Sequence, residues 1–360
     1  MENFNNYIVN ISNLKHNFNI IKQHLNPNVK VCAMVKADAY GHGIKDVCKG
    51  LKEADFFGVA SVYEACQIRK FDKDTSILIV GVFNHEYALW CSQNNVSVAV
   101  TSLAELKELI DILDGSILKI HIKINSGLNR IGVDSLSQFK SMLKLIKHHS
   151  NIVLEGLFTH FATKSNDVQF IIKQHGQFLK YVALIDETKV IVHCCNSYAT
   201  LLFPCFQHGM VRCGYNLYGW QNEFNFDFKP VLNITSKIVF LHKIKKGESV
   251  GYDRTFVAKK DSVIGVVPIG YADGFDRRLS NQFKVLVNGK FVNVVGNICM
   301  DVFMVDVTNI NVNVGDDVVL IGDSFGMRIT PQDYATCLGT SPYEILLKFD
   351  YRRFNRIILK

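Results

Sequence analysis

The chain has 360 residues, of which 48% are hydrophobic and 20% are charged, a composition typical of a globular protein with a large core. The net charge of +7 is spread along the chain, and the densest basic cluster, "YRRFNR", is short. This pattern argues against a nucleic-acid-binding protein and favours at most an anionic ligand. The apolar runs are far shorter than the roughly 20 residues that a membrane helix needs.

Ten cysteines lie at irregular spacing without a CxxC pair, and the first residues, "MENFNNYIVN", show no signal-peptide pattern. We therefore expect reduced thiols in a cytoplasmic protein. The histidines, cysteines and carboxylates show no metal-ligand spacing, so the sequence predicts no metal site.

The first two-thirds of the chain alternate between short apolar runs and segments with helical periodicity. The runs are rich in Val and Ile and bounded like buried strands. They occupy residues 29–35, 56–60, 76–82, 96–100, 117–124, 152–158, 189–194 and 209–214. Segments 102–113, 138–149 and 168–185 have the apolar spacing of amphipathic helices.

Eight strand–helix units predict an α/β fold with a parallel (β/α)8 barrel over residues 1–233, and a doubly wound sheet is the competing topology. The first residues could pack with the C-terminal part. Residues 234–360 are rich in strand-like runs, with an Asn-Gly hairpin turn in "VNGK". This predicts a mainly β C-terminal domain, with one late helix at 342–349.

In a barrel, catalytic groups follow the carboxyl ends of the strands. Lys36 ends the first strand, and Lys123 and Arg130 follow the fifth. The later strand ends contribute His160, Asn196, Ser197, Arg212, Gly214 and Tyr215. No Asp/Glu pair accompanies them, which argues against a glycosidase.

Lys36 is either a solvated strand end or a reactive amine. A lysine surrounded by other cations has a lowered pKa and can act as a nucleophile. The hydroxyl and glycine-rich backbone of "NS" and "RCGY" suit a phosphate. A lysine together with a phosphate site suggests pyridoxal 5'-phosphate (PLP) as the cofactor.

Several segments, in order along the chain, make the interpretation specific. They are "MVKADAYGHG", "HIKINSGLNRIGV", "EGLFTHFAT", "NSYATL", "MVRCGYNLYG", "VGYDRTF", "IGYADGFDRRLS", "GNICMDVFMVDV" and "GTSPYEIL". Each resembles a segment of the alanine racemase family. The resemblance implies a PLP-dependent enzyme of the barrel-plus-β type, which acts as a homodimer with active sites shared across the interface. It would interconvert L-alanine and D-alanine and supply D-alanine for peptidoglycan.

The resemblance also implies roles for individual residues. Lys36 would bind the cofactor covalently and act as the base that serves D-alanine, and Tyr252 of a partner chain would serve L-alanine. A racemase needs one base on each face of the substrate's α-carbon. Arg212 would face the pyridine nitrogen and, because arginine stays protonated, would only donate a hydrogen bond there. His160 would lie beside the cofactor ring and bond Arg212.

The remaining roles concern the phosphate and the substrate. Tyr40, Ser197, Gly214, Tyr215 and Tyr343 match the phosphate binders of the family. Arg130 would contact the cofactor phenolate oxygen and the substrate carboxylate, and Met300 of the partner chain would contact the substrate. Lys123 matches a lysine that is often carbamylated. The chain departs from the common pattern at Asp38, Asn125, Asn129, Asn297, Phe303 and Asn355.

Three alternatives stay open. A racemase of another small amino acid, such as serine, tends to have a smaller residue at the position of Tyr343. A barrel-type PLP decarboxylase would place a carboxylate where Arg212 stands. A non-catalytic PLP-binding barrel would lack the β domain and would have no use for Tyr252.

Overall fold

The computed structural model describes residues 4–163, 167–220 and 225–360. Contacts within the chain divide it into two compact units. One unit comprises Leu14–Ala39 and Gly43–Phe228, and the other comprises Met1–Asn13, Tyr40–His42 and Lys229–Lys360. The main division follows Phe228, and the boundary expected from the sequence lies between residues 233 and 234. The second unit also includes two short early segments, residues 1–13 and 40–42.

The first unit contains a parallel eight-stranded sheet in the order β8, β7, β6, β5, β4, β3, β2, β9. Backbone hydrogen bonds from Gly209 to Val192 (3.0 Å) and from Arg212 to Cys195 (2.9 Å) join β9 to β8 and bring the two edges together. The strands are β2 Lys30–Met34, β3 Phe56–Val59, β4 Ser76–Ile79, β5 Val96–Val100, β6 Leu118–Lys123, β7 Ile152–Phe158, β8 Ile191–His193 and β9 Met210–Cys213.

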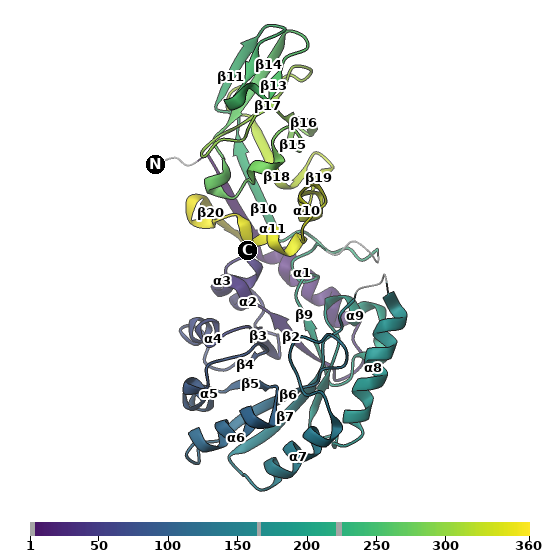
Figure 1. Cartoon of the computed structure of the whole chain (residues 1–360). Coiled ribbons are helices and arrows are strands. Elements are labelled where there is room, and N and C mark those ends of the chain that lie inside the picture. The colour runs from purple at the N-terminus through teal and green to yellow at the C-terminus, as the bar shows by residue number, and fades with distance from the viewer. Residues whose placement is uncertain (1–3, 164–166, 221–224) are drawn as a thin grey trace. The chain divides into compact units, whose positions relative to one another are not determined.

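Helices cover the outside of these strands, as Figure 1 shows for α4 to α8. The helices of this part of the chain are α1 Ile11–Gln23, which begins in the other unit, α3 Ile44–Gly50, α4 Val62–Arg69, α5 Ala88–Gln93, α6 Leu103–Ile112, α7 Leu136–Lys147, α8 Val168–Val182 and α9 Ser197–Leu202. The segment labelled α2, Lys36–Tyr40, is a left-handed turn. All residues of β3 and β5 are buried, which explains their continuous apolar sequences. The predicted (β/α)8 barrel is confirmed, and the doubly wound alternative is wrong.

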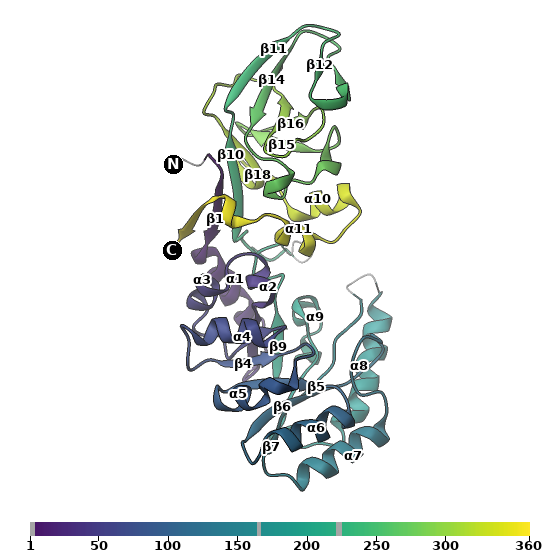
Figure 2. The ribbon, with the colours of Figure 1, turned by 60° about the vertical axis from the view of Figure 1, so that its left-hand side comes forward.

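The second unit is built on a largely antiparallel sheet in the order β11, β14, β17, β16, β15, β18, β10, β1, β20, with β19 beside β18. Figure 2 labels β11, β14, β16, β15, β18, β10 and β1 of this sheet. Within the described residues, β1 and β20 form the parallel pair of this otherwise antiparallel sheet. Its strands are β1 Asn6–Asn10, β10 Leu232–Lys237, β11 Phe240–Ile244, β14 Ser262–Val267, β15 Lys284–Val287, β16 Lys290–Val294, β17 Phe303–Asp306, β18 Asp317–Ser324, β19 Met327–Ile329 and β20 Asn355–Leu359. A separate ribbon is formed by β12 Ser249–Val250 and β13 Phe256–Val257.

Two local expectations for this unit have different outcomes. Strands β15 and β16 are joined by Asn288 and Gly289 with φ of 49° and 71°, the left-handed pair that a tight Asn-Gly hairpin requires. The expectation of one late helix is wrong, because α10 Pro331–Leu338 precedes α11 Pro342–Lys348. Thr330 caps α10 reciprocally with Asp333, and Pro331 stands in its first turn, so local capping chemistry starts this short helix.

Within the described residues, no helix is both long and apolar enough to cross a membrane. All ten cysteines lie in the described part of the chain and are free thiols, as the irregular spacing predicts.

Candidate active site

Five basic side chains gather at the carboxyl ends of the barrel strands. Lys36 follows β2, Lys123 ends β6, His160 follows β7 and Arg212 lies in β9. Arg130 lies in the loop after β6 and acts electrostatically on Lys36, Lys123 and His160. The strand-end residues chosen from the sequence therefore share one region of the first unit.

Lys36 is partly buried among these cations. Burial, followed by the charge of Arg130, lowers the pKa of its amine, while Glu64 opposes this shift. The Glu64 carboxylate is fixed by the backbone N–H groups of Ala37 (2.6 Å) and Ala60 (2.7 Å). A lysine with a lowered pKa has a larger fraction of neutral amine, the form that attacks a carbonyl carbon.

The turn after Lys36 is left-handed. Ala37, Asp38, Ala39 and Tyr40 have φ between 51° and 55°, a conformation that costs about 1–2 kcal/mol for each residue with a side chain. The Asp38 carboxylate accepts a hydrogen bond from Ile44 N at 2.7 Å, which ties the turn to the start of α3. Such strain persists only where the surroundings enforce it, and it is frequent at functional sites.

Arg212 is almost fully buried and its guanidinium is held from several sides. Its Nη1 lies 2.7 Å from Nδ1 of His193, and its Nη2 donates to Thr159 O at 2.7 Å and to Cys194 O at 3.2 Å. Nη2 also lies 3.4 Å from Nδ1 of His160, so the expected contact between these two residues is present. These contacts fix the plane of the guanidinium within the barrel.

His193 connects Arg212 to a charged group deeper in the barrel. Its Nε2 lies 2.8 Å from Nδ1 of His121, whose Nε2 lies 3.1 Å from Oε2 of Glu155. Because Arg212 can only donate and the Glu155 carboxylate can only accept, both histidines must carry their proton on Nε2. The result is a single directed chain of donors from Arg212 through His193 and His121 to Glu155.

Burial sets the charges along this chain. It lowers the pKa of both His121 and His193, so the two imidazoles stay neutral. Burial is the largest single influence on Glu155 and raises the pKa of its carboxyl, but the interactions with His121, Ser97 and Lys119 together outweigh it and hold this pKa at about 2. The anion of Glu155 thus compensates the buried cation of Arg212 through two neutral rings.

A β-bulge directs Glu155 to this position. The register of β6 and β7 shifts between Ile120, which faces Leu154, and His121, which faces Gly156, so Glu155 is the extra residue. A Cβ at position 156 would lie 2.1 Å from His121 Nδ1, so only glycine leaves room for the imidazole. Sequence reasoning missed His121, His193 and Glu155, although polar residues inside the apolar runs "ILKIHIKI", "KVIVHC" and "IVLEGLF" were a usable signal.

Lys123 is buried, and its Nζ lies 5.5 Å from the centre of the Phe158 ring. Burial and then the charge of Arg130 lower the pKa of this amine to about 8. The loop that carries Arg130 is held by Asn125, whose amide donates to Asn129 Oδ1 at 3.1 Å and to Asp134 Oδ1 at 2.6 Å. Asn129 has a φ of 56°, a left-handed conformation that asparagine tolerates well.

Ser197 and Gly214 also lie together. The backbone N–H of Gly214 donates to Ser197 Oγ at 2.8 Å, and Asn196 caps the helix α9 that Ser197 begins. Tyr215 follows Gly214 and is half-buried. A hydroxyl next to the backbone of a glycine-containing turn suits a phosphate group.

The other predicted residues belong to the second unit. There the rings of Tyr40 and Tyr343 lie 5.8 Å apart. Tyr252 and Met300 are 71% and 54% exposed, so neither side chain is buried by its own unit. Asn297 donates to Tyr252 O at 3.1 Å and to Asp253 Oδ2 at 2.9 Å, and thereby fixes the turn that carries Tyr252.

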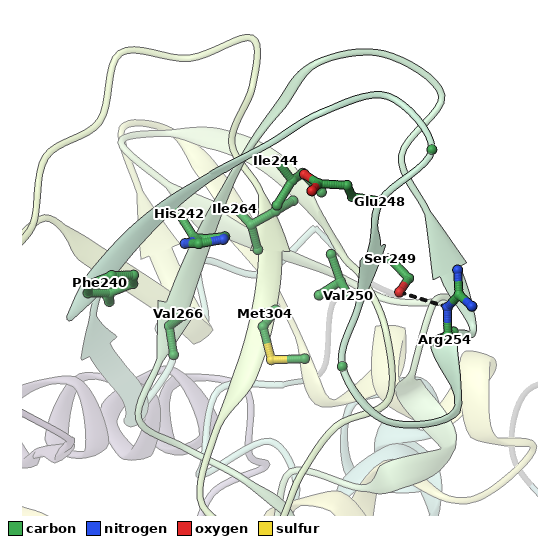
Figure 3. Close-up of a pocket in the computed structure, with 12 residues that line it drawn as sticks. Phe240, His242, Ile244, Glu248, Ser249, Val250, Arg254, Ile264, Val266 and Met304 are labelled. Carbon is green, nitrogen blue, oxygen red and sulfur yellow. Dashed lines mark hydrogen bonds between the residues drawn. The ribbon is translucent and has the colours of Figure 1, made fainter.

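A pocket of about 610 Å³ lies elsewhere in the second unit (Figure 3). Phe240, Val250 and Met304 contribute to its lining, and Arg254 at its edge donates to Ser249 Oγ at 3.1 Å. It contains none of the lysines and lacks the convergent cations of the barrel. The barrel site is therefore the candidate active site. The pocket of the second unit lies next to the turn that carries Tyr252.

The barrel residues fit PLP. Lys36 offers an amine with a lowered pKa, Arg212 offers fixed donors, and Ser197 with Gly214 offers neutral partners for a phosphate. A barrel with a lysine at the end of its first strand, followed by a mainly β domain, defines a class of PLP-dependent enzymes.

Comparison with known proteins identifies the family within this class. The profile "Alanine racemase, N-terminal domain" matches residues 9–222, and "Alanine racemase, C-terminal domain" matches residues 231–358. A protein named alanine racemase 2 from Caldanaerobacter subterraneus subsp. tengcongensis is 37% identical over 98% of this chain and 94% of its own length. An alanine racemase from Ligilactobacillus salivarius is 35% identical over 96% of this chain and 95% of its own length.

Solved structures agree with the sequence comparisons. The crystal structure of alanine racemase from E. faecalis has a TM-score of 0.93 at 32% identity, with 99% of this chain and 98% of that chain covered. The Bacillus anthracis alanine racemase, crystallised with bound L-Ala-P, has a TM-score of 0.90 at 31% identity, with 100% of this chain and 96% of that chain covered. The chain belongs to the alanine racemase family, a family of PLP-dependent isomerases, as its motifs predict.

Proposed function

We propose that this protein is an alanine racemase that interconverts L-alanine and D-alanine with Lys36 and Tyr252 as its two bases. The observation that carries the proposal is the directed hydrogen-bond chain that fixes Arg212 beside the reactive lysine. PLP, when bound, withdraws electrons from the substrate and so acidifies its Cα–H bond. A decarboxylase of this fold would need a carboxylate at the position of Arg212.

Lys36 removes or returns the proton on one face of the α-carbon, because its lowered pKa allows a neutral amine to act as a base. Tyr252 serves the opposite face. One base alone would return each proton to the face from which it came, so inversion requires both. Arg212 would donate to the pyridine nitrogen of bound PLP, which would stay unprotonated, and side reactions would be limited.

The remaining residues bind and orient. Arg130 would hold the substrate carboxylate and the phenolate oxygen of the cofactor, with Lys123 beside it, and His160 would steady Arg212. Met300 contacts the substrate. The cofactor phosphate would be held by residues with hydroxyl or backbone donors, namely Tyr40, Ser197, Gly214, Tyr215 and Tyr343. The retention of Tyr343 favours alanine over a larger substrate such as serine.

We further infer a homodimer in which Tyr252 and Met300 of one chain complete the site of the other. Their high exposure supports this arrangement, because an isolated chain leaves both side chains largely in water. The free thiols suit the reducing cytoplasm. There the D-alanine product would enter peptidoglycan.

Isotope exchange tests this function. L-alanine incubated with the holoenzyme in D2O should give D-alanine with deuterium at Cα. Tyr252→Phe should slow removal of the L-alanine proton at least about a hundredfold, as loss of a general base does, and change KM little. Release of carbon dioxide, or deuterium incorporation without inversion, would contradict the proposal.

A further inference from the structure

A second cluster of reactive side chains in the barrel unit contains no cofactor-binding side chain, although the backbone carbonyl of one member, Cys194, accepts a hydrogen bond from Arg212 at 3.2 Å. It consists of His175 on α8, Cys194 directly after β8 and His208 in the turn before β9. One ring nitrogen of each histidine and the cysteine Sγ all lie within 4.8 Å of one another. These positions are far apart in the sequence and form no compact motif, which is why the sequence predicts no metal site.

The cluster is arranged like a set of ligands. Cys194 is fully buried and its thiol donates to Phe206 O at 3.1 Å, while His175 is 8% exposed. One ring nitrogen of each histidine converges with the cysteine Sγ. The two Nε2 atoms lie 2.9 Å apart, so at most one of them carries a proton. Two imidazoles and one thiolate are the soft-to-borderline donors that Zn²⁺ selects over Mg²⁺ or Ca²⁺.

A carboxylate stands behind one of the histidines. Oε2 of Glu187 lies 3.5 Å from Nδ1 of His208, the ring nitrogen that faces away from the cluster. A carboxylate at this place keeps a proton on Nδ1 and leaves the lone pair of Nε2 for a metal, the arrangement common behind zinc-bound histidines. His175 is held by Phe206, whose ring stacks on the imidazole at 3.7 Å.

We propose that His175, Cys194 and His208 bind one thiophilic divalent cation, of which Zn²⁺ is the natural candidate. Binding replaces the thiol proton of Cys194 with the metal and releases that proton to solvent, while the proton between the two histidines moves to Nδ1 of His175. Three protein ligands leave a fourth tetrahedral position for water, which can reach the site because His208 is 14% exposed.

Cobalt(II) titration of the holoenzyme tests this site, because tetrahedral Co²⁺ with a thiolate ligand has characteristic absorption. The protein should be treated with a chelator, desalted and kept reduced. We expect one Co²⁺ per chain, with a ligand-field band at longer wavelength than the absorption of the cofactor, and displacement by Zn²⁺. Zn²⁺ alone should also raise Tm, because it binds only the folded chain.

Variants separate this site from surface binding. Cys194→Ser should abolish the thiolate band, and Glu187→Gln should keep that band but weaken binding about 10- to 100-fold. Cys205→Ser, which removes an exposed thiol near the site, should change nothing. Cofactor absorbance and Tm of each variant verify folding. Absence of Co²⁺ binding to the wild type, or a thiolate band that survives Cys194→Ser, would overturn the proposal.

Discussion

Arg212 presents an electrostatic problem at the level of single residues, because its guanidinium is only 5% exposed and burial lowers its pKa. An uncompensated buried cation is costly. Glu155 supplies the opposite charge, and the two intervening histidines transmit it without carrying charge themselves. Glu155 therefore positions Arg212 through the two histidines and makes no direct contact with the guanidinium.

Glu155→Gln tests this role. The substitution keeps the size of the side chain and removes its charge, so the direction of the hydrogen-bond chain is no longer enforced. We expect kcat to fall about 10- to 100-fold, since a hydrogen bond to a charged group contributes about 1.5–3 kcal/mol. The ¹⁵N shifts of His121 and His193 should also show loss of the single Nε2–H tautomer.

The matched control is Lys119→Met. Nζ of Lys119 lies 3.5 Å from Oε1 of Glu155 on the exposed side, so its removal breaks an ion pair and leaves the chain to Arg212 intact. This variant should retain near wild-type kcat. An equal loss in both variants would mean that Glu155 acts only through general stability.

The reaction of the Lys123 amine with carbon dioxide should depend on pH. The pKa of about 8 means that the amine is protonated below this pH and increasingly neutral above it. Only the neutral amine reacts with carbon dioxide, and the anionic product would lie among cations. At constant dissolved ¹³CO₂, a carbamate ¹³C resonance should therefore grow between about pH 7 and 9. It should be absent in Lys123→Met, and a wild-type spectrum without it would refute the modification.

At the level of elements, the turn that carries Tyr252 depends on a neighbouring loop. This turn lies between β12 and β13 and contains Asp253 with a φ of 61°. Asn297 bonds both Tyr252 O and Asp253, so an amide from the loop after β16 sets where the tyrosine points. Asn297 stands where the family pattern has arginine more often, and asparagine makes these bonds directly.

Asn297→Ala should loosen this turn. We expect the rate from L-alanine to fall about 5- to 10-fold with little change in KM, which corresponds to the loss of a neutral hydrogen bond of about 1 kcal/mol. Steady-state kinetics in both directions provide the measurement. Asn309→Ala is a suitable control, because the Asn309 side chain accepts a hydrogen bond from the exposed amine of Lys260 at 3.0 Å. An equal fall of the rate in Asn309→Ala would contradict a specific role of Asn297 in holding the Tyr252 turn.

The sequence predicts the elements better than it predicts their connections. All eight barrel strands could be located, because parallel strands buried on both faces are continuous apolar runs. Their polar terminal residues indicated Lys36, Lys123, His160 and Arg212. The left-handed turn after Lys36 could not be foreseen, since alanine has no preference for that conformation. Residues His121, His193 and Glu155 were missed because only strand register and a bulge bring them together.

At the level of the whole molecule, the two proposed bases belong to different units of the chain. Lys36 is held within the barrel unit, while Tyr252 is exposed on the β unit. Two-fold symmetric dimers are the commonest assemblies of identical chains, and in such a dimer each chain presents the same surface to the other. In the proposed homodimer, Lys36 of one chain works with Tyr252 of its partner.

Subunit mixing tests this central claim most directly. Lys36→Ala and Tyr252→Ala chains should each be inactive alone. After unfolding and refolding together in equal amounts with PLP, half of the dimers are mixed, and each mixed dimer has one site with both bases intact. The account predicts recovery of about one quarter of wild-type racemisation, given random pairing in a two-fold dimer. If refolded wild type is active but the mixture is not, Lys36 and Tyr252 do not act across two chains, and the account is contradicted.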